Sequence, residues 1–184
     1  MAWNTFPAGL FTAGAILTAA QMNTYMRDNL TQLRGDFMRF DLTTGSLTLN
    51  STAWANVSTA TDLTLAASAG DVVQVSLSTL LGNEAVDLFL DAVTLVGAVV
   101  TNSFATAGAV DASGQGIMGW RGTGSVFTSV GGSLFYKLVA GDVSGGNVVI
   151  RLRYRGGSAS NKTMFATSSV RTTFSARNHG PVEI

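Results

Sequence analysis

The amino-acid sequence predicts a mostly β protein, a jelly-roll-like β-sandwich preceded by an extended N-terminal arm and one short α-helix. Over residues 37–180, Thr, Val, Phe and Ser alternate with other apolar residues, and glycine-rich turns separate about eight to eleven short runs. Helix start and stop signals agree in one place, close to the N-terminus. We therefore divide the chain into an anchoring arm and helix, residues 1–35, and a β-sandwich head domain, residues 36–184.

The first 17 residues are apolar and aromatic, but proline and glycine interrupt them too often for a helix. Trp3, Phe6 and Phe11 are the large side chains of this arm, and such side chains need a surface to lie on. We expect an extended arm that docks on a partner. Packing of the arm on its own head domain is the alternative.

Residues 19–34 are predicted to form the one helix. Thr18 is a suitable N-cap, Gln21 has the spacing of a capping box, and Gly35 stands where a left-handed C-cap is expected. The apolar positions form a single narrow stripe: Met22, Met26, Leu30 and Leu33. Because an isolated helix of this length is marginal in water, the stripe must pack on something. It could seal against the β domain or form a short trimeric helix bundle.

The head domain is expected to be β throughout. We place strands near residues 37–42, 46–50, 60–66, 72–80, 86–95, 99–105, 115–121, 125–130, 133–139, 147–155 and 163–176. Gly131-Gly132 is read as a two-residue hairpin turn, and Gly145-Gly146 as another turn.

The clearest strand, residues 147–155, has the sequence NVVIRLRYR. Strand alternation places its apolar residues on a core face, and Arg151, Arg153 and Arg155 on the opposite face, toward water or a partner. Tyr154 points away from the arginines, which weakens the case for nucleic-acid binding. We favour an inter-subunit charge ladder formed with acids of a neighbouring copy.

The charge distribution bears on that choice. Residues 1–120 carry three arginines against nine acids, whereas residues 121–184 carry eight basic residues against two acids. These halves could meet between subunits, or they could neutralise each other within one monomer. Charged residues make up 12% of the chain, well below the roughly 25% of ordinary soluble domains, which favours a protein that hides surface in an assembly. No run is long enough to span a membrane.

Catalytic and metal-binding patterns are not found in the sequence. There is no cysteine, and His179 is the one histidine, without a nucleophile elbow to serve. Asp87 and Asp91 share a strand face about 13 Å apart, too far for a glycosidase pair, and are expected to face solvent and protect the strand from aggregation. We therefore predict no enzyme activity, no metal and no cofactor.

Aromatic residues of the head leave two interpretations open. Trp54, Trp120 and Tyr136 could form a sugar-stacking platform, or they could be buried in the core.

The two ends of the chain carry a family resemblance. The segment FTAGAILTAAQMNTYMRDNLTQLRG, residues 11–35, and the close FSARNHGP, residues 174–181, resemble the corresponding parts of tailed-bacteriophage virion proteins. Such proteins include head decorations, head fibres and minor tail components. The resemblance implies a homotrimer on the virion, assembled in the host cytoplasm, whose arm anchors on the major capsid protein or another virion protein. The alternative is a tail fibre or tail-tip protein that recognises host surface glycan.

Overall fold

A computed structural model of the chain describes Thr18 and residues 36–82, 88–105, 108–109, 120–122, 127–158 and 162–181. In this part of the chain the backbone is mostly β, with two short 3-10 turns, η2 (Thr59–Thr61) and η3 (Ala140–Asp142). The predicted β class is confirmed. The docking arm (Trp3, Phe6, Phe11) and the helix stripe (Met22, Met26, Leu30, Leu33) lie outside the described residues.

The first sheet has six strands arranged in four rows, because in two of the rows two short strands lie end to end. Its members are β1 (Phe37–Leu42), β2 (Gly45–Leu49), β5 (Val72–Gly82), β10 (Thr128–Lys137), β13 (Lys162–Ala166) and β14 (Thr172–Asn178). The first row, β1 then β2, pairs with β14 and β13, which form the second row. That row pairs with β5, and β10 covers the other edge of β5 along nearly its whole length. All of these pairings are antiparallel.

The second sheet is built around β12 and β6. Its members are β3 (Ala55–Asn56), β4 (Leu63–Ala66), β6 (Leu88–Val96), β7 (Val99–Ser103), β8 (Gly108–Ala109), β9 (Trp120–Gly122), β11 (Val143–Ser144) and β12 (Asn147–Gly156). One edge of β12 pairs with β4 and β3, and the other with β11 and β6. The free edge of β6 pairs with β7 and β9.

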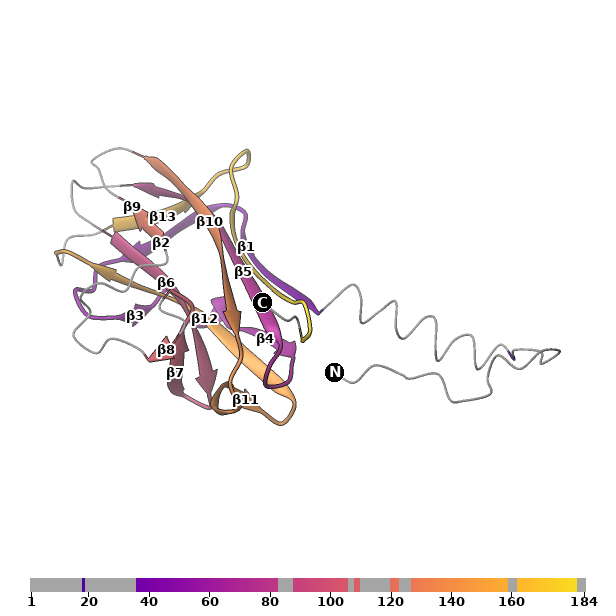
Figure 1. The fold of residues 1–184 in the computed structure, drawn as a ribbon. Coiled ribbons are helices and arrows are strands. Elements are labelled where there is room, and N and C mark those ends of the chain that lie inside the picture. The colour runs from indigo at the N-terminus through magenta and orange to yellow at the C-terminus, as the bar shows by residue number, and fades with distance from the viewer. Residues whose placement is uncertain are drawn as a thin grey trace.

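The strand pairs are nested along the chain. The first row pairs with the last strands, β4 with β12, β5 with β10, and β6 with β7. In Figure 1, β1, β5 and β10 belong to one layer and β6, β7 and β12 to the other. The layers also meet at one edge, where the Asn178 side-chain amide donates a hydrogen bond to the Ala66 carbonyl over 2.9 Å. The result is a nearly closed, barrel-like arrangement.

The core lies between the two sheets and is filled by the inward residues of each strand. In β5, buried and more exposed positions alternate, as expected for a strand with one face on the core. Both sheets contribute to a single apolar cluster. The largest fully buried side chains are Phe174, Leu49, Leu65, Leu90, Leu95, Leu138, Ile150, Leu152 and Met164.

Two predictions about strand boundaries are wrong. Gly131 and Gly132 do not form a hairpin turn; they lie inside β10, paired with Ser78 and Leu77. A Cβ on Gly131 would come within 3.0 Å of the Leu77 carbonyl oxygen, so a close backbone approach, rather than a turn, explains this glycine. The strand predicted at 163–176 is divided into β13 and β14 by residues 167–171.

The turn predicted at Gly145-Gly146 is confirmed, and it connects β11 to β12. Both glycines have positive φ, 58° and 76°, as a two-residue type I′ hairpin turn requires. No atom lies within 4 Å of a Cβ built on Gly146, so a side chain there would meet strain only in the backbone.

We expect Gly146→Ala to lower the free energy of unfolding by about 1–2 kcal/mol, because an L-residue in the left-handed region carries this cost. Gly141→Ala is the matched control, since Gly141 also has open space around its Cβ but no positive φ. Urea denaturation of both variants measures the difference. Equal midpoints for the two would contradict the turn assignment.

Candidate functional site: the arginine face

The outward side of β12 carries the predicted arginines on one face. Their inward neighbours Val148, Ile150, Leu152 and Tyr154 are buried, so the predicted alternation is confirmed. We call Arg151, Arg153 and Arg155, together with the side chains that contact them, the arginine face. The three arginines differ in what they contact.

Arg151 is paired with an acid of its own chain. Its Nε donates to Asp62 Oδ1 over 2.7 Å, and its Nη2 donates to Asp62 Oδ2 over 2.5 Å. This bidentate geometry is the strong form of an arginine–carboxylate contact. The hydrogen bonds that Arg151 donates to Asp62 raise the pKa of Arg151 above its usual value, against a smaller opposing effect of burial.

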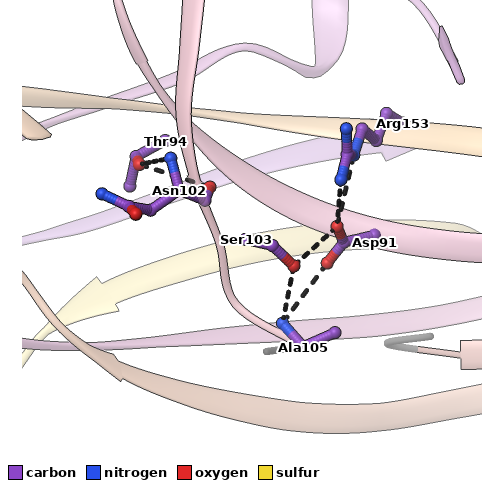
Figure 2. A network of polar contacts seen from close by, with 6 residues as sticks. All are labelled: Asp91, Thr94, Asn102, Ser103, Ala105 and Arg153. Atoms are coloured by element: carbon purple, nitrogen blue, oxygen red, sulfur yellow. Dashed lines mark hydrogen bonds and ion pairs between the residues drawn. The ribbon is translucent and has the colours of Figure 1, made fainter. Parts of the chain in front are cut away.

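Arg153 is paired with Asp91 in the interior of the protein (Figure 2). Its Nε and Nη2 donate to Asp91 Oδ2 over 3.2 and 2.9 Å. The same oxygen accepts from the Ser103 hydroxyl over 2.9 Å, and Oδ1 accepts from the Ala105 N–H over 3.4 Å. Asp91 is 0% exposed and Arg153 5% exposed, so the expectations of a solvent-facing Asp91 and of an open face at Arg153 are wrong.

The environment of Asp91 determines what it can do. Burial raises the pKa of this carboxyl, and the opposing contributions of Arg153, Ser103 and Ala105 do not cancel that rise. An acid with a raised pKa in a cleft is a candidate proton donor. Asp91 is wholly enclosed, however, and its oxygens contact protein donors, so we assign it a structural role.

Arg155 has aromatic neighbours instead of an acid. Its guanidinium carbon lies 4.9 Å from the centre of the Phe89 ring and 5.8 Å from that of Trp54. Phe89 on β6 is the residue directly opposite Arg155 in the register. The Nε of Arg155 and the indole Nε1 of Trp54 are buried and have no hydrogen-bond partner in the described part of the chain. Trp54 also stacks on Arg153, whose guanidinium carbon is 4.2 Å from the ring centre.

A second polar cluster lies at the η3 corner and centres on Asp142, which is 0% exposed. Its Oδ1 accepts from Thr94, Thr101 and Asn102 over 2.7, 2.9 and 2.7 Å. Its Oδ2 accepts from the Tyr136 hydroxyl and the Val139 N–H, both over 2.9 Å. The side-chain donors come from β6, β7 and β10, so the cluster joins the two sheets.

The contacts of the Asp142 cluster shift the pKa values of both Asp142 and Tyr136. Burial would raise the pKa of Asp142, but the hydrogen bonds outweigh it and hold that pKa below the usual value. Burial, and then Asp142 itself, raise the pKa of Tyr136 above its usual value of 10.0. Tyr136 is 4% exposed, so within this head it is a core residue rather than part of a sugar platform.

Three further observations on the described residues concern the one histidine, metal-ligating side chains and membrane-spanning helices. His179 is exposed and its Nε2 lies 3.0 Å from Gln74 Oε1. No group of three or more metal-ligating side chains occurs among the described residues. In the same part of the chain, no helix is long and apolar enough to cross a membrane.

Sequence reasoning thus identified the arginines but missed their partners Asp62, Trp54 and Phe89, as well as Asp142. The excess of acids in the first half was the one available signal, and intramolecular pairing across the halves is what the structure contains for Arg151 and Arg153. No protein-family model and no curated protein matches this chain.

Proposed function

We propose that this chain is a non-enzymatic structural protein of a tailed-bacteriophage virion, a trimeric capsid decoration protein anchored by its N-terminal arm. The carrying observation is that Asp36, where the head domain begins, lies beside the end of its last strand, β14. The Asn178 N–H donates to the Asp36 carbonyl, and the Val72 N–H donates to the Gly180 carbonyl, each over 2.8 Å. Residues 1–35 therefore join the head at the end where the last strand also finishes, which leaves the opposite end free to project.

We also infer that the head is a jelly roll. The nested pairing supports this, because a chain folded as one long antiparallel hairpin and then rolled around a core gives two facing antiparallel sheets joined as Greek keys. Jelly rolls are common in viral capsid domains. The fold by itself does not fix function, and the resemblance of the two chain ends supplies the link to the virion.

The proposed mechanism is adhesive. Trp3, Phe6 and Phe11 would dock on the major capsid protein or another virion protein, and the helix stripe would hold three copies together. Burial of apolar area at about 25 cal/mol per Å² in each arm, multiplied over three linked copies, gives strong attachment from weak single contacts. The low charge content of the chain is consistent with much of the surface being covered in the assembled particle.

A second candidate function, a tail protein that recognises host glycan, is favoured by one observation. Arg155 lies near the rings of Trp54 and Phe89, and no acid among the described residues is paired with it. Against this candidate, Tyr136 is in the core and one ring of the suggested platform, Trp54, is stacked on Arg153.

Replacing the arm aromatics in the full-length protein, Trp3→Ala with Phe6→Ala and Phe11→Ala, should abolish saturable binding to purified virion heads while the trimer mass is kept. The reason is that the docking area is lost and the helix stripe is untouched. Co-sedimentation with heads and light scattering measure the two properties.

The matched control is Val99→Ser, which removes an apolar side chain that is 67% exposed on the head domain. It should bind heads as the wild type does. A wild-type protein that is monomeric and indifferent to heads would rule out the decoration function.

A further inference from the structure

We propose that the row Trp54–Arg155–Phe89 on the outer face of the second sheet is a binding site for a carboxylate, and that its ligand is an acidic sugar of the uronic-acid class. None of its residues belongs to the arm or helix, residues 1–35, so the proposal goes beyond the decoration role. It rests on the described contacts of two neighbouring strands, β12 and β6, and of Trp54 just before β3.

The first argument is a comparison of the arginines within this chain. Arg151 and Arg153 are successive outward residues of β12, and each uses the same two atoms, Nε and Nη2, to bind a carboxylate. Arg155 is the next residue on that face, yet its Nε is buried without a partner among the residues with described contacts. A buried donor left unpaired is costly, so a carboxylate arriving there restores the pattern of its two neighbours.

The second argument is that no described acid is placed to serve Arg155. The residue across from Arg153 on β6 is Asp91, but the residue across from Arg155 is Phe89. Asp62 is bound in a bidentate pair to Arg151, and Asp91 is enclosed by Arg153, Ser103 and Ala105. Within the described part of the arginine face, the positive charge of Arg155 is balanced by aromatic faces alone.

The third argument is preorganisation. A guanidinium stacked on aromatic rings is held in one orientation, and its planar fork matches a carboxylate. Arg155 remains partly exposed even though its Nε is buried. Trp54, whose ring centre is 5.8 Å from the Arg155 guanidinium carbon, offers a second buried donor, its indole N–H, that has no partner among the described residues. Aromatic walls with a few fixed polar groups are the usual composition of a small-ligand site, and they suit a sugar, whose ring has apolar C–H faces.

The test is a titration of full-length protein with sodium glucuronate, followed by the indole N–H signal of Trp54, which is assigned with Trp54→Phe. Glucose at the same concentration and ionic strength is the neutral probe, and sodium sulfate is the simple-anion probe. We expect a saturable shift with glucuronate and none with glucose or sulfate. Arg155→Met should weaken glucuronate binding by about tenfold or more, because charge-assisted hydrogen bonds are lost.

Two further variants make the outcome specific. Arg155→Lys keeps the positive charge but loses the planar guanidinium that can bind both carboxylate oxygens. We therefore expect its glucuronate affinity to lie between that of the wild type and that of Arg155→Met. Arg39→Met removes an exposed arginine of the first sheet, which is paired with Asp41, and should bind as the wild type does.

The proposal is overturned by the absence of a saturable glucuronate shift, by equal binding in Arg155→Met, or by equal shifts with sulfate. A loss of oligomer mass in Arg155→Met would also overturn it, since Arg155 would then belong to a subunit contact. Head binding by the wild type is measured separately, so failure of this site does not bear on the decoration function.

Discussion

Replacing Arg153 with methionine is expected to lower the free energy of unfolding by about 3–5 kcal/mol, the usual cost of leaving one charge of a buried ion pair alone. Asp91 is 0% exposed, and after the change only Ser103 and Ala105 remain to solvate it. Methionine fills much of the same volume, so a large loss of stability would come from the unpaired Asp91 carboxylate rather than from a cavity. Urea denaturation at neutral pH measures it.

Three companion variants separate the causes. Asp91→Asn with Arg153→Met removes both charges and should recover most of the loss, because no buried charge is stranded. Arg151→Met is the matched control: its pair with Asp62 is partly exposed, with side-chain exposures of 16% and 25%, so we expect a smaller loss. A loss below about 1 kcal/mol in Arg153→Met would mean that the pair is hydrated in solution.

The effect of pH on Arg153→Met has a definite sign. Without the arginine, the pKa of Asp91 in the folded state should rise further above its usual value of 3.8. A group whose folded pKa is raised favours folding when it is protonated. The variant should therefore come closest to wild type near pH 4 and fall increasingly below it as the pH approaches neutrality.

Sequence alternation was sufficient for the local geometry of the arginine face. In the 147–155 strand, period-two patterning correctly separates a core side from an arginine side. It cannot say what covers the outer side, because Asp91 and Arg153 meet across 62 residues of sequence and only the register of β6 against β12 brings them together. Asp91 was therefore interpreted as a solvent-facing residue when it is the most enclosed acid of that face.

Glycine pairs illustrate a different limit. Gly145-Gly146 and Gly131-Gly132 are the same dipeptide, and both were interpreted as turns. The first has positive φ at both residues and is a turn, whereas the second lies within β10 where the backbone of β5 comes close. Glycine meets two needs, a left-handed backbone and a close approach, and a single sequence does not distinguish them.

Asp142 had no sequence signal, although its contacts predict a large effect. Replacing it with alanine is expected to lower the free energy of unfolding by about 3 kcal/mol or more, since several buried donors lose their acceptor at once. Tyr136 and Thr94, at 4% and 0% exposure, cannot turn to water instead. Asp142→Asn should cost less, because it keeps one acceptor oxygen but presents an amide to the Val139 N–H.

The control for this change is Asp41→Asn, which removes an acid from an exposed pair with Arg39. We expect an effect of about 0–1 kcal/mol there, as for other surface pairs. An Asp142→Ala variant as stable as Asp41→Asn would show that the cluster is open to water in solution.

The pH dependence of the wild-type free energy of unfolding should show the stabilising contribution of Asp142. Its folded pKa is lowered, so its contribution is complete above the unfolded value of 3.8 and disappears as the pH falls through the folded value. Tyr136 has a raised folded pKa, so its contribution is complete below 10.0 and is lost as the pH rises beyond that. Wild-type stability should therefore fall at both limits. Asp142→Asn should flatten the acid side, and Tyr136→Phe should flatten the alkaline side, because each removes the group whose titration drives that loss.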